Sequence, residues 1–139
     1  MPDKRIIEFI KHHHLLTLAT SKYNTPYCCN VFYLYDEGNN KLIFSSDPKT
    51  KHAQDFIENP EVAGTIALET KDIKKIQGVQ LLGRIAKLKV EEINNVTKQY
   101  LKAFPYAEKK KLYLWEMRLA FIKMTHNKLG FGKKIIWQK

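Results

Sequence analysis

The hydrophobic positions in the first third of the chain change from a helical to a β-strand period. Residues 3–13 carry an apolar stripe broken by charges, formed by Ile6, Ile7, Phe9 and Ile10, which predicts a helix. Three β-prone runs follow, at 15–20, 27–35 and 41–46. Turn residues separate them, at 22–25 and at Glu37-Gly38-Asn39-Asn40, a strong hairpin signal. We therefore expect three strands joined by short turns.

A second helix is expected from Asp47-Pro48 to about Asn59. Asp is a favoured N-cap, and Pro is tolerated at the first helical position because its missing N–H would have no intrahelical partner. Three apolar side chains share one face of this helix, namely Ala53, Phe56 and Ile57, and Asn59-Pro60 ends it.

The rest of the chain is again mostly β-prone. Strands are expected at 62–68 and 76–90, where Gly78 and Gly83 can mark bulges or bends. A helix is expected at 91–104, followed by Pro105 and a Lys-rich helical turn. The segment 112–125 is extended in its latter part, and a glycine-flanked turn at 130–132 leads to a short strand at 135–137.

This order of elements predicts an α+β protein that is mainly β. Antiparallel strands with one inserted and one late helix are typical of a small β-barrel, in which closure removes exposed edges. The 139 residues suit one domain spanning 1–139. The alternation of a Rossmann fold is absent, and so are the GxGxxG and GxxxxGK[ST] phosphate loops.

Composition agrees with a globular protein, with 44% hydrophobic and 27% charged residues. No apolar run approaches the roughly 18 residues that span a bilayer. The N-terminal segment is interrupted by Glu8 and by His12-His13-His14, unlike a signal peptide, so we expect a cytoplasmic protein.

Cys28 and Cys29 are neighbours in a predicted strand and point to opposite faces, which argues against a disulfide. They are either half-buried thiols or, for one of them, a reactive thiol facing a ligand.

The formal charge of +10 is spread along the chain and comes mostly from lysines. Base readout favours arginine, and no zinc-finger or RNP-type motif is present. A solvated lysine-rich surface that favours anionic ligands is the first interpretation, and a nucleic-acid-binding module is an alternative.

The segment from Phe44 to Ala53 carries the most specific chemistry. The end of a predicted strand supplies two hydroxyls and the predicted first helical turn supplies two ammonium groups, a hydroxyl and an imidazole: Ser45, Ser46, Lys49, Thr50, Lys51 and His52. Phosphate binding needs such donors and positive charge on a rigid element, and a helix N-terminus adds its dipole. A capping Asp47 would compete for the free amides, so we expect side chains to do most of the binding. An ordinary capped helix with a solvated first turn is the alternative.

Several motifs in order resemble the pyridoxamine 5′-phosphate oxidase-like FMN-binding split β-barrels. They are Pro26-Tyr27-Cys28-Cys29-Asn30-Val31-Phe32-Tyr33, Leu42-Ile43-Phe44-Ser45-Ser46, Lys49-Thr50-Lys51-His52-Ala53 and Asn59-Pro60-Glu61-Val62-Ala63. Gly78-Val79-Gln80 with Gly83, and Leu129-Gly130-Phe131-Gly132-Lys133-Lys134 with Trp137, resemble its small bacterial YhbP-type branch. The resemblance covers nearly the whole chain.

The resemblance implies a six- to seven-stranded antiparallel split barrel, a homodimer, and FMN at the subunit boundary. It also implies a flavin-dependent oxidoreductase whose substrate and catalytic residues the sequence does not identify. In such proteins the FMN phosphate is held by a Ser or Thr ending the third strand and by basic residues opening the next helix, a pattern that falls on Ser46, Thr50, Lys51 and His52. On the helical wheel, Lys49 lies nearest the apolar face and Lys51 points away from it, so all four helix-opening residues 49–52 remain candidates.

Other residues are candidates for the flavin ring. Asn30 either hydrogen-bonds the isoalloxazine edge or satisfies a neighbouring backbone group, and Gln77 and Gln80 are similar candidates. Trp137 and Phe131 either pack on the flavin from the partner subunit or belong to the core. The chain departs from many members of the family in having Cys29 or Asn30 where they have an Arg. His52 replaces a further basic residue, and its charge depends on pH.

A haem-binding or haem-degrading split barrel is the alternative from another class, because related barrels use haem. His12 to His14, His52 and His126 are the possible iron ligands. We expect no separate metal site, since successive helical histidines point in different directions. Glu116 and Arg118, alternating in a predicted strand, are expected to form an exposed pair.

Overall fold

Seven antiparallel strands form one sheet that closes on itself. The computed structural model describes residues 1–139, and its long elements are α1 (Lys4–His12), β1 (Leu15–Lys22), β2 (Thr25–Asp36), β3 (Lys41–Ser45), α2 (Lys51–Glu58), β4 (Glu61–Ala67), β5 (Gln77–Lys87), α3 (Ile93–Ala103), β6 (Leu114–His126) and β7 (Lys134–Gln138). Short 3₁₀ helices lie at Ile73–Lys75, Val90–Glu92, Pro105–Lys109 and Asn127–Leu129. No helix is both long and apolar enough to cross a membrane.

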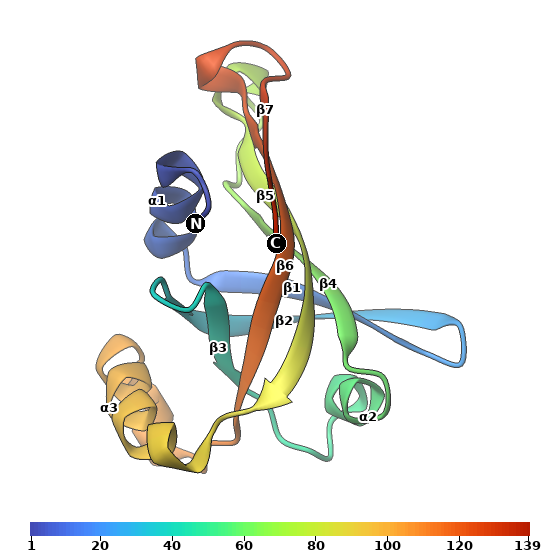
Figure 1. Ribbon diagram of the computed structural model, residues 1–139, viewed down its shortest axis with the longest axis vertical. Helices are drawn as coiled ribbons and strands as arrows, with labels where there is room; N and C mark the ends of the chain where they lie inside the picture. Colours follow the sequence, from blue (N-terminus) through green and yellow to red (C-terminus); the bar gives the residue numbers. More distant parts are fainter.

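The strand order is β3-β2-β1-β4-β5-β6-β7, and an additional pairing of β3 with β6 closes the barrel. β7 therefore lies outside the closed ring, hydrogen-bonded to β6 (Figure 1). The β5–β6 ladder shifts register between Leu82 and Gly83, where Ala120 of β6 has no partner in β5. A Cβ on Gly83 would lie 2.6 Å from the carbonyl oxygen of Arg118, so the bulge needs glycine there. The predicted mainly β, six- to seven-stranded antiparallel split barrel is confirmed, and the number of strands is seven.

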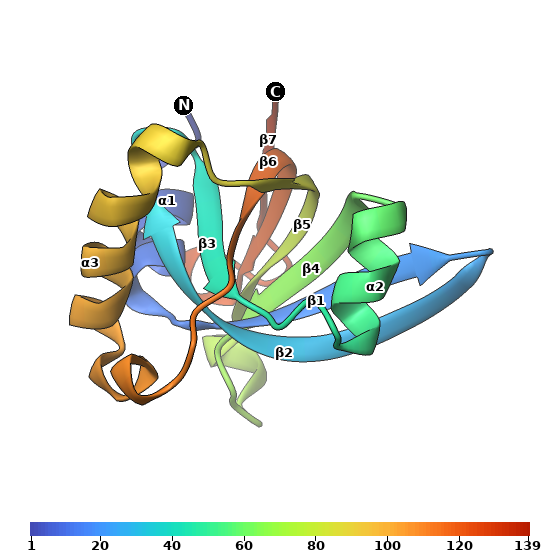
Figure 2. The same ribbon diagram turned by 90° about the horizontal axis from the view of Figure 1, so that it is seen from below.

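Helices cover different parts of this barrel (Figures 1 and 2). α1 contributes Ile6, Phe9 and Ile10 to the main core, and α2 contributes Ala53 and Phe56. α3 instead packs through Val96 and Tyr100 against Ile43 and Leu88, forming a second, smaller cluster. Both faces of β3 are therefore buried.

Two expectations about burial were wrong. Ile57 is 53% exposed, because the buried face of α2 uses Asp55 beside Ala53 and Phe56. Glu116 is buried, because β3 supplies Lys41 as a partner from across the barrel seam.

Candidate functional site

The loop between β3 and α2 is fastened to the start of β6. The amide of Ser46 donates to the carbonyl of Tyr113 at 2.9 Å, and the Tyr113 amide donates to Ser45 Oγ at 3.1 Å. The indole N–H of Trp115 donates to the carbonyl of Ser46 at 2.8 Å. The segment Ser46–His52, called the 46–52 corner below, therefore begins at a fixed point.

Thr50, not Asp47, caps α2. Thr50 Oγ1 accepts from the amide of Ala53 at 3.3 Å and donates to the carbonyl of Asp47 at 2.8 Å. Asp47 instead closes a turn before the helix, accepting from the Lys49 amide at 2.9 Å. Helix α2 therefore starts at Lys51, four residues later than Asp47, and the predicted Asp47 cap was wrong. Both residue types cap helices well, and the turn at 47–50 decides between them.

The change of cap leaves donors free at the start of α2. The amides of Lys51 and His52 donate to no protein acceptor, as is usual for the first turn of a helix. The Asp47 carboxylate, expected to compete for these groups, does not occupy them. Backbone amides are therefore available to an anion in addition to the side chains of the corner.

A hydroxyl–imidazole cluster lies in the same corner. His52 Nε2 is 2.8 Å from Ser46 Oγ and 3.4 Å from Thr50 Oγ1, and Ser46 is buried. Burial lowers the pKa of His52 below its ordinary value of 6.5, although the nearby Asp55 carboxylate acts in the opposite direction. His52 is therefore predominantly neutral at pH 7.5 in the unliganded protein.

Lys51 and Lys49 differ in their surroundings. Lys51 Nζ pairs with Asp55 at 3.1 Å and lies 5.0 Å from the centre of the Tyr27 ring. The side chain of Lys49 is exposed and forms no ion pair. The corner thus holds one lysine already paired within α2 and one free lysine.

Sequence reasoning missed the role of Asp55, which lies under this corner. Its carboxylate is buried and accepts from Thr20 Oγ1 at 2.9 Å as well as from Lys51. Burial alone would raise the pKa of Asp55, but the bonds from Thr20 and Lys51 outweigh it and the pKa is lowered. The i, i+4 spacing to Lys51 is a signal in the sequence, whereas Thr20 is distant along the chain.

Two of the proposed ring-binding residues lie on the outer face of the sheet. Asn30 Oδ1 accepts from Thr17 Oγ1 at 2.8 Å, so Asn30 bonds a side chain of β1 and not the backbone. Gln80 is exposed and, with Thr17 and Cys28, lines a cavity of about 500 Å³. None of the corner residues lines this cavity, so one chain alone does not bring the two groups together.

The remaining two candidates lie elsewhere. Gln77 lines a cavity of about 420 Å³ between α1 and β6, together with His12, His13 and His126. Trp137, on β7, is half-buried against the main core. No group of three or more His, Cys, Asp or Glu side chains is arranged to hold a metal ion.

The architecture defines a fold class, the split β-barrel, which this chain shares with solved structures of other proteins. A haem-binding protein from Mycobacterium smegmatis has a TM-score of 0.76 at 18% identity, over 90% of this chain and 52% of that one. An FAD-binding protein from Mesorhizobium loti has a TM-score of 0.71 at 14% identity, over 89% and 94% of the two chains. A candidate pyridoxamine 5′-phosphate oxidase from Listeria innocua has a TM-score of 0.68 at 13% identity, over 86% and 94%. At these identities the likeness shows the fold alone.

Within that class, the chain belongs to the UPF0306 family. It is 35% identical over 140 residues to a UPF0306 protein of Yersinia pestis bv. Antiqua (strain Angola), covering 99% of this chain and 95% of the relative. A UPF0306 protein of Yersinia pseudotuberculosis (strain IP 31758) gives the same identity and coverage. No family model matches the sequence.

Proposed function

We propose that this protein binds FMN and is a flavin-dependent oxidoreductase of the cytoplasm, working as a homodimer. The observation that carries the proposal is the pair of unpartnered amides at the start of α2, beside the hydroxyls and imidazole of the 46–52 corner. Such a donor set suits a phosphate, which a helix N-terminus also favours electrostatically. The motifs at 78–83 and 129–137 support assigning the chain to the YhbP-type branch.

Different groups of the corner would contact the phosphate in different ways. The amides of Lys51 and His52, with the hydroxyl of Ser46, would donate hydrogen bonds, and Lys49 would supply positive charge. His52 would gain a proton beside the phosphate, because an adjacent anion favours the imidazolium form. The flavin would supply hydride or electron transfer through its isoalloxazine ring, so the chain needs no acid–base pair of its own.

A second subunit is part of the proposal. Asn30 and Gln80 lie on the outer sheet face, away from the corner, so a ring bound between two copies would reach both groups. Trp137 of a partner is a further candidate for packing on the ring. As part of the same proposal, residues 1–139 act as one domain.

Flavin titration tests the proposal. FMN fluorescence should be quenched saturably by the purified protein at micromolar concentration. The double variant Lys49→Gln/His52→Gln removes the free lysine and the titratable imidazole of the corner, and should weaken binding about tenfold or more, the range expected for a charged hydrogen-bonding group. Lys98→Gln, on the exposed surface of α3, is the control and should bind FMN as the native chain does. Lack of saturable quenching would reject the proposal.

A haem-binding function is a second candidate, favoured by the cavity between α1 and β6. His12, His13, His126 and Met124 line it together with Lys4 and Arg5, which could face haem propionates. His126 Nδ1 is buried and has no hydrogen-bond partner. Haem titration should then give a Soret band that shifts or disappears in His126→Ala. An unchanged band in that variant would remove His126 as the ligand.

A further inference from the structure

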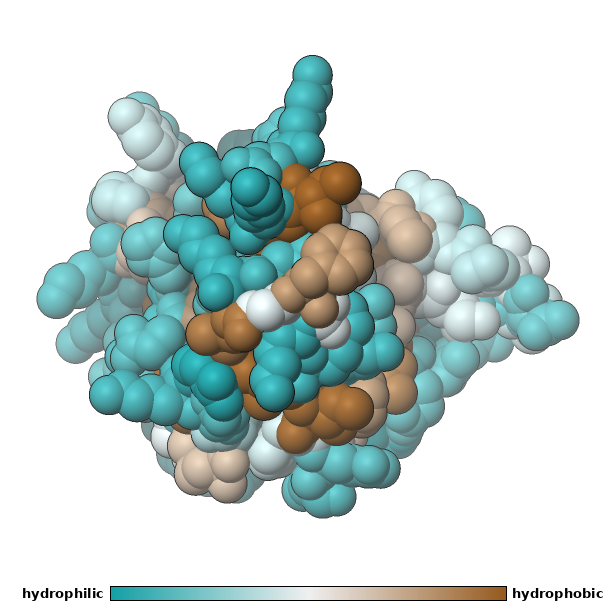
Figure 3. All heavy atoms as spheres, turned by 90° about the horizontal axis from the view of Figure 1, so that it is seen from above, coloured by the Kyte–Doolittle hydropathy of each residue, from teal (hydrophilic) through white to brown (hydrophobic).

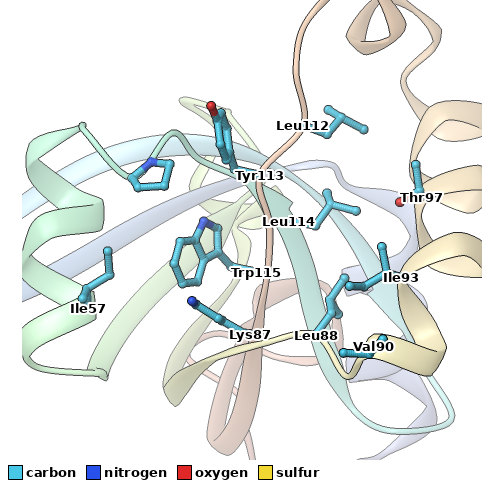
Figure 4. A pocket seen from close by; sticks show the side chains of 11 residues that line it. Ile57, Lys87, Leu88, Val90, Ile93, Thr97, Leu112, Tyr113, Leu114 and Trp115 are labelled. Carbon is cyan, nitrogen blue, oxygen red and sulfur yellow. The ribbon is translucent and has the colours of Figure 1, made fainter.

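A hydrophobic groove lies at the end of the barrel where β6 begins (Figure 4). Helices α2 and α3 stand on either side of this end of the barrel (Figure 2). The volume of the groove is about 530 Å³, within the range of roughly 300–1,000 Å³ typical of small-molecule sites. The start of β6 runs through it, with Trp115 near α2 and Leu114 near α3. Three apolar side chains on its walls are solvent-exposed: Ile57 (53%), Val90 (84%) and Ile93 (42%).

The inner wall of the groove is held in place by contacts elsewhere in the fold. Trp115 donates its indole N–H to the Ser46 carbonyl and packs edge-on against Phe56, with ring centres 4.9 Å apart. Leu88 belongs to the buried cluster beneath α3. A ligand would therefore meet a preformed apolar surface and would not need to open one.

One charged side chain lines the groove. Lys87 extends into it beside Trp115 (Figure 4), forms no ion pair, and has no acidic residue among the other lining side chains. The remaining polar groups are the hydroxyls of Thr97 and Tyr113. An apolar wall with a single unpaired cation complements a molecule that has an apolar body and one negative charge.

We propose that this groove binds an amphipathic carboxylate: a fatty-acid-like molecule with its apolar body against Ile57, Trp115 and Leu88 and its carboxylate on Lys87. The apolar body would cover side chains that are now exposed to water. The carboxylate would pair with Lys87 Nζ, the one ammonium group that lines the groove. A long apolar amine would place its charge against Lys87, and a neutral alcohol would leave Lys87 without an anionic partner. The site is separate from the cavity lined by Thr17, Cys28 and Gln80.

Tryptophan fluorescence can report on this groove directly. The chain has two tryptophans, and Trp137 lies in β7, outside the groove. In the Trp137→Phe variant, Trp115 is the only reporter. Decanoate, added below the concentration at which it forms micelles, should change the Trp115 emission saturably. Decanol is the uncharged probe and should bind more weakly.

Matched variants separate the charge from the apolar contact. Lys87→Met should weaken decanoate binding about tenfold and leave decanol binding unchanged, because it removes a charged hydrogen bond but keeps an unbranched side chain. Lys89→Met removes an exposed charge that does not line the groove and should change neither. Ile57→Gln alters an exposed wall residue and should weaken both ligands.

Four results would overturn the proposal. They are lack of a saturable response, equal affinity for decanoate and decanol, an effect of Lys89→Met equal to that of Lys87→Met, and an unchanged affinity in Ile57→Gln. If decanoate instead splits an oligomer into monomers in sedimentation, the groove is an interface between copies and the proposal is wrong. Should Trp137→Phe fail to fold, the same comparisons can be made by thermal stabilisation of variants in the native background.

Discussion

His52 is the residue on which the charge of the 46–52 corner depends. Its side chain is half-buried, bonded to Ser46, and held near Asp55 and Lys51 of its own helix. Burial lowers its pKa, so the free imidazole is neutral at pH 7.5. An imidazole that becomes protonated only when an anion binds beside it should make the binding of that anion pH-dependent.

We expect the affinity for FMN to rise as the pH falls from 8 towards 6. A bound phosphate raises the pKa of His52, so binding takes up a proton and is favoured by acid. The second ionisation of a phosphate ester, with a pKa of about 6, acts in the opposite direction but equally in every variant. Calorimetric titrations across this pH range should therefore show a smaller rise in His52→Gln. Identical pH profiles for the two proteins would show that His52 does not face the phosphate.

The two cysteines should differ in reactivity. Burial, and then the neighbouring Cys28, raise the pKa of Cys29 to about 11, so at pH 7.5 only about one Cys29 side chain in 3,000 is a thiolate. Cys28 is exposed on the outer sheet face. Iodoacetamide at pH 7.5 should modify Cys28 well before Cys29, as judged by peptide mass spectrometry, and Cys28→Ser should be nearly inert. Faster labelling of Cys29 would contradict its buried position.

At the scale of elements, the start of α2 shows what a local pattern can and cannot decide. The sequence predicts the helix, its apolar residues Ala53 and Phe56, and its end near Asn59. It predicts Asp47 as the cap, whereas Thr50 caps the helix, because the turn at 47–50 delays the start of α2. The burial of Asp55 was not predicted, because its partner Thr20 lies in β1 and is distant along the chain.

Replacing each candidate cap separately tests this assignment. Thr50→Ala should lower the free energy of unfolding by about 1 kcal/mol, the usual cost of removing an N-cap side chain. Asp47→Ala should cost less than half as much, because Asp47 caps only the preceding turn. Urea unfolding of both variants measures the difference. A larger loss of unfolding free energy in Asp47→Ala than in Thr50→Ala would show that Asp47 caps the helix.

A buried ion network joins β3, β6 and the segment before α3. Lys41 Nζ lies 2.9 Å from Glu92 and 3.2 Å from Glu116, and Arg118 bonds the other oxygen of Glu116 at 2.6 Å. Burial would lower the pKa of Lys41, but the hydrogen bonds that Lys41 donates to Glu92 and Glu116 raise it. The network was not predicted, because β3 and β6 are far apart in the sequence.

Breaking this network should destabilise the barrel at its seam. Lys41→Met should cost about 3 kcal/mol, because it leaves the buried Glu116 with Arg118 alone. Glu92→Gln, at the more exposed end, should cost less than Lys41→Met. Chemical denaturation at pH 7 measures both. A loss below about 1 kcal/mol in Lys41→Met would show that the network contributes as little as a surface pair.

At the scale of the whole molecule, the sequence predicts the barrel well and the grouping of the candidate site residues only in part. The β-prone runs, the turn residues and the order of the motifs lead to the correct architecture. They do so because strands, turns and the buried core are determined within a single chain. Corner residues such as Ser46 and His52 come together, whereas Asn30, Gln77 and Trp137 lie on other surfaces. Seen from above, the surface is mostly hydrophilic with separated apolar groups (Figure 3). Hydrophobic patterning reports which side chains are buried, but it does not report which exposed side chains lie next to one another.

The central claim is that the start of α2 and the 46–52 corner hold a phosphate attached to a flavin. Comparing FMN with riboflavin by calorimetry tests it most directly, because the two ligands share the ring and ribityl chain and differ only in the phosphate. We predict that FMN binds at least about tenfold more tightly, as expected for charged hydrogen bonds to unpartnered amides. Equal affinities, or binding of neither ligand, would contradict the account.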